Sequence, residues 1–98
     1  MARVETSPLT QELIKHRLAW LRKEWEAVPG YAQQWLAWDE ETKLDFVLEA
    51  GIREDYLAGA RDWARRGILK PAQLAELREI EAIASANRPL LEPLLAED

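Results

Sequence analysis

Cysteine is absent from the 98 residues of this chain, and asparagine, histidine and methionine each occur once. Without cysteine there are no disulfides, thiolate metal ligands or cysteine nucleophiles. The longest apolar runs are only a few residues long, well short of the roughly 20 that span a bilayer. We therefore expect no membrane-spanning segment. The lack of both disulfides and an apolar signal segment favours a cytoplasmic location.

Residues that favour strands are also scarce, because valine and isoleucine together occur only 8 times. Leucine and alanine, which are strong helix formers, occur 15 times each. The composition therefore predicts an all-α fold. A chain of this length is the size of one domain, so residues 1–98 are expected to form a single helical domain.

The formal net charge of −5 argues against a nucleic-acid backbone as the main partner. The charge is unevenly distributed along the chain. Residues 29–50 and 71–98 are acidic, whereas residues 1–28 and 51–70 carry a small positive excess. This alternation predicts ion pairs between neighbouring helices. A dipolar surface that steers a partner is the less favoured interpretation.

Helix start and stop signals divide the chain into short segments. Proline suits the first position of a helix, as at Pro8 and Pro71, and Asp39 is a good N-cap. Glycine and proline end helices, which places stops at Pro29-Gly30, Gly51, Gly67 and residues 87–89. The sequence therefore predicts a compact bundle of five short helices, preceded by a frayed arm (1–6) and followed by a Pro/Leu-rich C-terminal turn (89–98). The expected helices span 8–28, 31–38, 40–50, 53–66 and 71–86.

Apolar spacing predicts which face of each helix is buried. In the first helix the seam is spaced 4, 3, 4, 3 and contains Ile14, Leu18, Leu21, Trp25 and Val28. In segment 40–50 the predicted seam contains Leu44, Val47 and Leu48, with Phe46 beside it. In segment 53–66 it contains Tyr56, Leu57, Ala60, Trp63 and Ala64.

Five tryptophans are the least ordinary feature of the composition. Trp25 and Trp63 lie in predicted seams and are assigned to the core. Trp20 lies outside its seam, and a short helix carrying Tyr31, Trp35 and Trp38 cannot easily bury them all. Tryptophan is enriched at interface hot spots, so these rings and the leucine-rich tail are the candidate interface. Its residues are Trp20, Tyr31, Trp35, Trp38, Leu90, Leu91, Leu94 and Leu95.

No polar cluster forms a recognisable catalytic or metal motif. Glu41, Asp45 and Glu49 are spaced by four and share one helical face, which we interpret as a solvated face relieved by Lys43, Arg53, Arg61 or Arg65. His16 has Glu12 one turn before it, but no nucleophile lies in a catalytic motif. We therefore expect no enzyme activity, cofactor or metal.

Two functions remain open from the sequence. The leading hypothesis is a protein-interaction module, such as an adaptor, regulator or inhibitor, with self-association included, because apolar surface is in surplus. The alternative is a small-molecule carrier or sensor, whose pocket between helices is lined by Trp20, Tyr31, Trp35 and Trp38.

Overall fold

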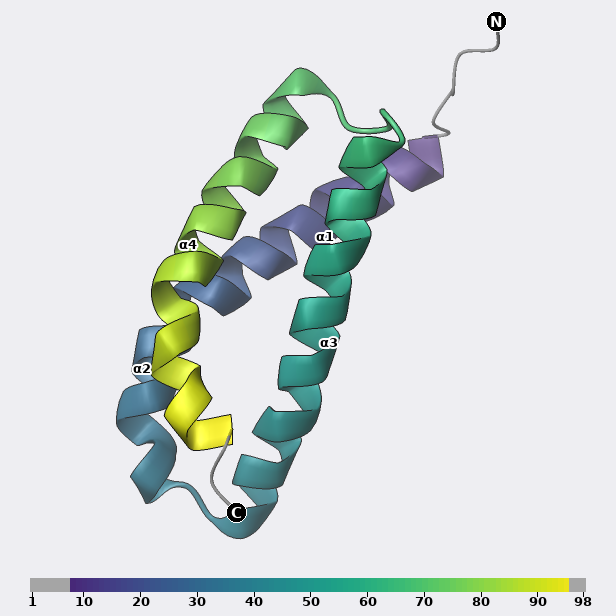
Figure 1. Cartoon of the computed structure of the whole chain (residues 1–98). Coiled ribbons are helices and arrows are strands. Elements are labelled where there is room, and N and C mark those ends of the chain that lie inside the picture. The colour runs from purple at the N-terminus through teal and green to yellow at the C-terminus, as the bar shows by residue number, and fades with distance from the viewer. Residues whose placement is uncertain (1–7, 96–98) are drawn as a thin grey trace, which may run out of the picture.

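The computed structural model describes residues 8–95, which form four α-helices and one 3₁₀ turn without any strand (Figure 1). The predicted all-α class is confirmed, but the predicted count of five helices is not. In chain order the elements are α1 (Pro8–Glu26), α2 (Val28–Gln34), the 3₁₀ turn η1 (Trp35–Ala37), α3 (Glu40–Arg65) and α4 (Pro71–Leu95). The expected arm at 1–6 and the last residues of the tail, 96–98, lie outside the described part.

Pro29 sets the change of direction between α1 and α2. Proline has no N–H, so it leaves the carbonyl oxygen four residues earlier, that of Trp25, without its helical donor. The first helix was predicted to run to residue 28 and to stop at Pro29-Gly30, but α1 ends two residues earlier, at Glu26, and α2 begins at Val28 with the proline in its first turn. Pro29 therefore starts a helix as well as ending one.

α3 runs without a break through Gly51, where the sequence predicted a stop. Gly51 has no positive φ and thus forms no left-handed end. Helix continuity is favoured because one buried face extends along almost the whole element. Its members follow the spacing 4, 3, 4, 3 and are Phe46, Ala50, Arg53, Leu57 and Ala60. The segments predicted at 40–50 and 53–66 are thus one helix of 26 residues.

Both ends of α3 follow the sequence signals. At its start the Asp39 side chain accepts a hydrogen bond of 2.8 Å from the Thr42 backbone N–H, as an N-cap does. At its end Gly67 has φ +74° and donates to Ala64, while the Ile68 N–H donates to the carbonyl of Trp63. This pair of hydrogen bonds is a Schellman motif, and it confirms the predicted stop at Gly67.

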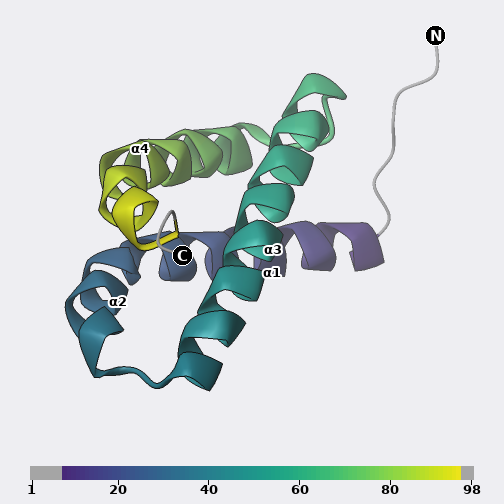
Figure 2. The same ribbon diagram turned by 60° about the horizontal axis from the view of Figure 1, so that its bottom comes forward.

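α4 begins at Pro71 as predicted but continues through Pro89 and Pro93, so the predicted break at residues 87–89 is wrong. An interior proline costs about 3 kcal/mol, which burial of Leu91 and of neighbouring apolar side chains offsets at roughly 1.5–3 kcal/mol each. The helix changes direction between its green and yellow parts (Figure 2). This bend brings its last turns alongside α2.

α3 and α4 run in roughly opposite directions, α1 crosses both and packs mainly against α4, and α2 lies beside the C-terminal turns of α4 (Figures 1 and 2). The molecule measures 54 × 23 × 18 Å, and its radius of gyration of 15.6 Å exceeds the ~13 Å of a compact chain of this length. The buried core follows α1, as its predicted seam requires, and is completed by α3 and α4. Its α1 members are Ile14, Leu18, Leu21 and Trp25, joined by Val28.

Ion pairs connect the helices, as the alternating charge predicted. Arg22 of α1 contacts Glu79 of α4 at 2.6 Å, and Arg61 of α3 pairs with Glu81 of α4. Among residues 8–95 no helix is long and apolar enough to cross a membrane.

Candidate interaction surface

Phe46 is the centre of an aromatic cluster at the start of α3. Its ring lies 5.4 Å from Tyr31, 5.6 Å from Trp35 and 5.5 Å from Trp38, measured between centroids. Trp35 is buried, whereas Tyr31 and Trp38 are half-buried. The structure therefore brings together three of the candidate interface residues around a side chain that the sequence placed beside the seam. Their packing fixes η1 against α3.

Trp20 lies apart from this cluster. Its ring packs edge-on against Tyr56 of α3 at 5.3 Å, and the guanidinium of Arg17 lies 3.6 Å from the centre of the same tyrosine ring. Trp20 is half-buried in this contact between α1 and α3. The four candidate aromatic residues consequently do not form one continuous surface.

The leucines of the predicted tail lie on different sides of α4. Leu91 is buried, Leu94 is half-buried against the core, and Leu90 is exposed. The side chain of Leu95 lies outside the described part of the structure. An interface role for this tail is still a prediction.

Arg53 is a charged residue inside the core, with only 1% of its surface exposed. Its guanidinium lies 3.7 Å from the carboxylate of Glu24 and 5.4 Å from the ring centres of both Trp25 and Phe46. Its Nε and Nη2 atoms have no hydrogen-bond acceptor among residues 8–95.

Burial, together with the carboxylate of Glu24, raises the pKa of the Tyr31 hydroxyl above its usual value.

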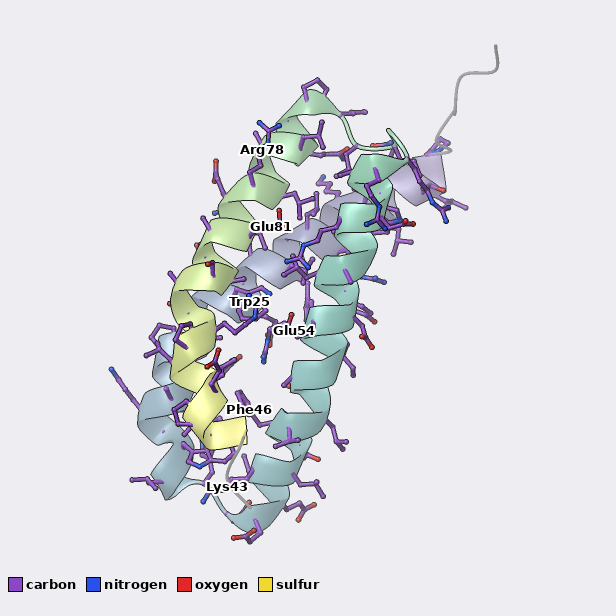
Figure 3. The ribbon with its side chains drawn as sticks, viewed as in Figure 1. Trp25, Lys43, Phe46, Glu54, Arg78 and Glu81 are labelled. Carbon is purple, nitrogen blue, oxygen red and sulfur yellow. The ribbon has the colours of Figure 1, made fainter. Side chains whose placement is uncertain are left out.

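A groove of about 270 Å³ lies between residues 47–54 of α3 and residues 88–92 of α4. Figure 3 shows Trp25, Phe46 and Glu54 on this inner side, between the two helices. Arg88 crosses the groove and binds Glu54 through two hydrogen bonds, of 2.9 and 3.1 Å. The lining combines these ion-paired groups with small and apolar side chains. It consists of Val47, Ala50, Gly51, Arg53, Glu54, Arg88, Leu91 and Glu92.

A second hollow, of about 260 Å³, is lined partly by the aromatic cluster. Tyr31, Trp38 and Phe46 form one side, and Thr42, Asp45 and Glu49 form the other. Trp20 and Trp35 are not among its lining residues. The aromatic pocket expected from the sequence is therefore present only in part, and half of its wall is polar.

The outward face of α3 carries the main exposed apolar surface of the helix, which we call the outer stripe. Its residues are Leu44, Val47, Leu48 and Ile52, whose surfaces are 58, 42, 61 and 45% exposed. At 100° per residue, Leu44 and Leu48 point away from Phe46 and Ala50, which face the core. The predicted seam of segment 40–50 was wrong in this respect, because the helix buries the other face.

An acidic row (Glu41, Asp45 and Glu49) lies beside the outer stripe. All three side chains are exposed. The solvated face predicted for them is thus confirmed, but the predicted relief by basic neighbours is not. Lys43 lies over the ring of Trp35, Arg53 faces Glu24, Arg61 binds Glu81 and Arg65 binds Asp62. No cation of residues 8–95 forms an ion pair with the row.

The sequence did contain a signal for the outer stripe. Segment 44–52 has two apolar rows at helical spacing, and a helix with one covered side needs only one of them. The sequence-based prediction chose the more hydrophobic residues Leu44, Val47 and Leu48 as the buried seam. The row that is actually buried is less hydrophobic in the sequence, because it contains Ala50 and Arg53. The burial of these residues depends on partners from α1.

The remaining polar groups do not gather into a reactive centre in the described structure. His16 is exposed and lies 3.4 Å from Glu12, on the same face of α1. No three metal-ligating side chains of residues 8–95 are grouped to hold an ion. Comparison of the chain with protein-family models, with curated proteins and with solved structures finds no match.

Proposed function

We propose that the chain is a small helical protein-interaction module whose docking surface is the outer stripe of α3. The observation that supports this proposal is the uncovered second apolar face of that helix. Leu44, Leu48 and Ile52 lie along about two turns of the helix with 58, 61 and 45% of their surfaces exposed, and Val47 lies at the edge of the groove toward α4. A helix that is apolar on two sides normally has neighbours on both.

The size of the stripe indicates what kind of contact it makes. Its side chains expose on the order of 300 Å² of apolar surface, an area that is often functional on a monomer. At about 25 cal/mol per Å², full burial supplies roughly 7 kcal/mol. Association itself costs about 4–15 kcal/mol, so the stripe alone supports weak binding. A regulator or adaptor that binds reversibly fits this balance, and no catalytic role is proposed.

Site-specific photo-crosslinking tests the proposal. A photoreactive amino acid is introduced at Leu48, in the stripe, and separately at Leu36, which is even more exposed but lies in η1. We expect the Leu48 position to capture a discrete protein in the native host, in a band that Leu44→Gln and Ile52→Gln abolish. Equal labelling at both positions, or no band that depends on the stripe, would rule out the stripe as a docking surface.

A carrier or sensor function is the second candidate, and the groove between α3 and α4 favours it. The groove is slightly smaller than typical ligand sites of about 300–1,000 Å³. The buried Arg53 beside it has two donors without acceptors, which suits a small apolar carboxylate or bound water.

Thermal-shift measurements with aromatic and aliphatic carboxylates test this second function. Gly51→Leu is the blocking variant, because Gly51 lines the groove and a Cβ atom at this position meets no atom within 4 Å, which leaves room for the larger side chain. Stabilisation of the unmodified chain that disappears in Gly51→Leu supports a carrier. Equal stabilisation of both proteins, or none, argues against one.

A further inference from the structure

We infer that the outer stripe binds a cationic amphipathic helix from a different protein, with the basic side chains of that helix facing the acidic row. This inference rests on the proposed function, because it names the partner of the same surface. The partner presents aliphatic side chains at i, i+4 and i+8 and a parallel row of lysines or arginines at the same spacing.

The two rows on α3 have matching geometry. Leu44, Leu48 and Ile52 repeat every four residues, and so do Glu41, Asp45 and Glu49. Residues four apart stack on one side of a helix, so the rows run side by side for about 12 Å, the rise of eight residues. A helix laid along α3 therefore contacts an apolar line and an acidic line together.

The carboxylates of the acidic row have no ion-pair partners among residues 8–95. Its three carboxylates repel one another at spacing four, and no described cation pairs with them. Elsewhere in the described structure, the carboxylates of Glu54, Glu79 and Glu81 are paired with arginines of another helix. A cationic partner relieves this repulsion and adds long-range attraction, which steers association.

A second copy of this chain fits the surface less well. Two stripes packed face to face in antiparallel orientation bring two acidic rows together. Most arginines that could face the row already pair with acidic side chains of the same chain. These are Arg22, Arg53, Arg61, Arg65, Arg66 and Arg88. The same acidic row repels nucleic-acid phosphates and anionic membranes.

Fluorescence anisotropy with three designed peptides tests the inference on the full chain. The first peptide is a helix with leucines at i, i+4 and i+8 beside a lysine row. The second has glutamates in place of the lysines, and the third is a scrambled version of the first. Protein variants are the stripe variant Leu44→Gln/Leu48→Gln/Ile52→Gln and the row variant Glu41→Gln/Asp45→Asn/Glu49→Gln. The matched control, Glu12→Gln/Glu26→Gln/Glu92→Gln, makes the same charge change on exposed residues of α1 and α4 and leaves the Arg22–Glu79 ion pair between these helices intact.

The lysine peptide is expected to bind and the other two are not. Three exposed ion pairs are each worth a few tenths of a kcal/mol, so the row variant should bind about ten-fold more weakly at low salt. The stripe variant should lose binding, and the control should stay within about two-fold. Raising the ionic strength to ~0.5 M should remove most of the difference between the row variant and the control.

Three results would overturn the inference. They are no binding of the lysine peptide, equal loss in the row variant and the control, and concentration-dependent dimers in sedimentation that the stripe variant abolishes. In each case photo-crosslinking at Leu48 still decides the proposed function. A stripe-dependent crosslink to a protein would keep that function while rejecting a cationic helix, and absence of a crosslink would reject both.

Discussion

Asn87 of α4 donates a hydrogen bond of 2.8 Å from its Nδ2 atom to the backbone carbonyl oxygen of Trp25 in α1. In a regular helix this oxygen would accept a hydrogen bond from the backbone N–H of residue 29. Residue 29 is a proline and has no N–H, so the oxygen lacks its helical donor. The only asparagine of the sequence thus replaces a missing helical donor from another helix. This contact fixes the bend between α1 and α2 to the middle of α4.

Removal of the Asn87 side chain is expected to destabilise the fold. Asn87→Ala leaves a partly buried carbonyl without a donor, at a cost of about 1–2 kcal/mol in the free energy of unfolding. Pro29→Ala supplies the absent N–H, so in that background Asn87→Ala should cost markedly less. Urea denaturation of the four proteins in this double-mutant cycle measures the coupling. Equal losses in both backgrounds would show that Pro29 and Asn87 act independently.

Two glycines should respond oppositely to alanine. Gly51 lies inside α3 with open space around a built Cβ, so Gly51→Ala should stabilise the chain by about 0.4–1 kcal/mol. Gly67 has φ +74° in the Schellman motif, so Gly67→Ala should destabilise it by about 1 kcal/mol or more. Thermal or urea unfolding distinguishes the two. Destabilisation by Gly51→Ala would indicate a helix break at that residue.

The helix starts at Pro71 and after Asp39, and the stop at Gly67, could be predicted because each depends on a local backbone requirement. The continuation of α3 through Gly51 and of α4 through Pro89 could not be predicted. At both positions, packing of apolar side chains against other helices outweighs a local cost to helix stability of about 1–3 kcal/mol. The buried face of α3 was predicted wrongly for a related reason. The buried row contains Arg53, whose place in the core is set by Glu24, Trp25 and Phe46, and two of these come from α1.

Phe46 and Leu48 are two positions apart on α3 but should differ sharply in their effect on stability. Phe46 is 5% exposed within the aromatic cluster, so Phe46→Ala should cost about 3–5 kcal/mol. Leu48 is 61% exposed, so Leu48→Ala should change stability by no more than about 0.5 kcal/mol. Chemical denaturation measures both. A large loss for Leu48→Ala would mean that the outer stripe is covered in the isolated chain.

The N-cap at Asp39 should make stability depend on acid pH. The backbone N–H of Thr42 donates to its carboxylate and lowers the pKa of Asp39 below its ordinary value of 3.8. A carboxyl group with a lowered folded-state pKa stabilises the fold above its unfolded-state pKa, and this contribution is lost as the pH falls through the folded-state pKa. Thermal midpoints between pH 7 and pH 2 should therefore show a difference between the unmodified chain and Asp39→Ala that narrows below pH 3.8. Asp39→Asn keeps the acceptor without the charge and serves as the control, because its stabilisation should not fade in acid. A constant difference for Asp39→Ala would contradict the cap.

The central claim is that α3 uses one apolar face for the core and the other for a partner. Backbone amide shifts of the ¹⁵N-labelled chain, titrated with the cationic amphipathic peptide, test it most directly. We expect the largest shifts along residues 41–52 on the face of the outer stripe and acidic row, and little change near Trp20 or Leu90. Shifts centred on the aromatic cluster or on the groove beside Arg53, or no shifts at saturating peptide, would contradict the claim.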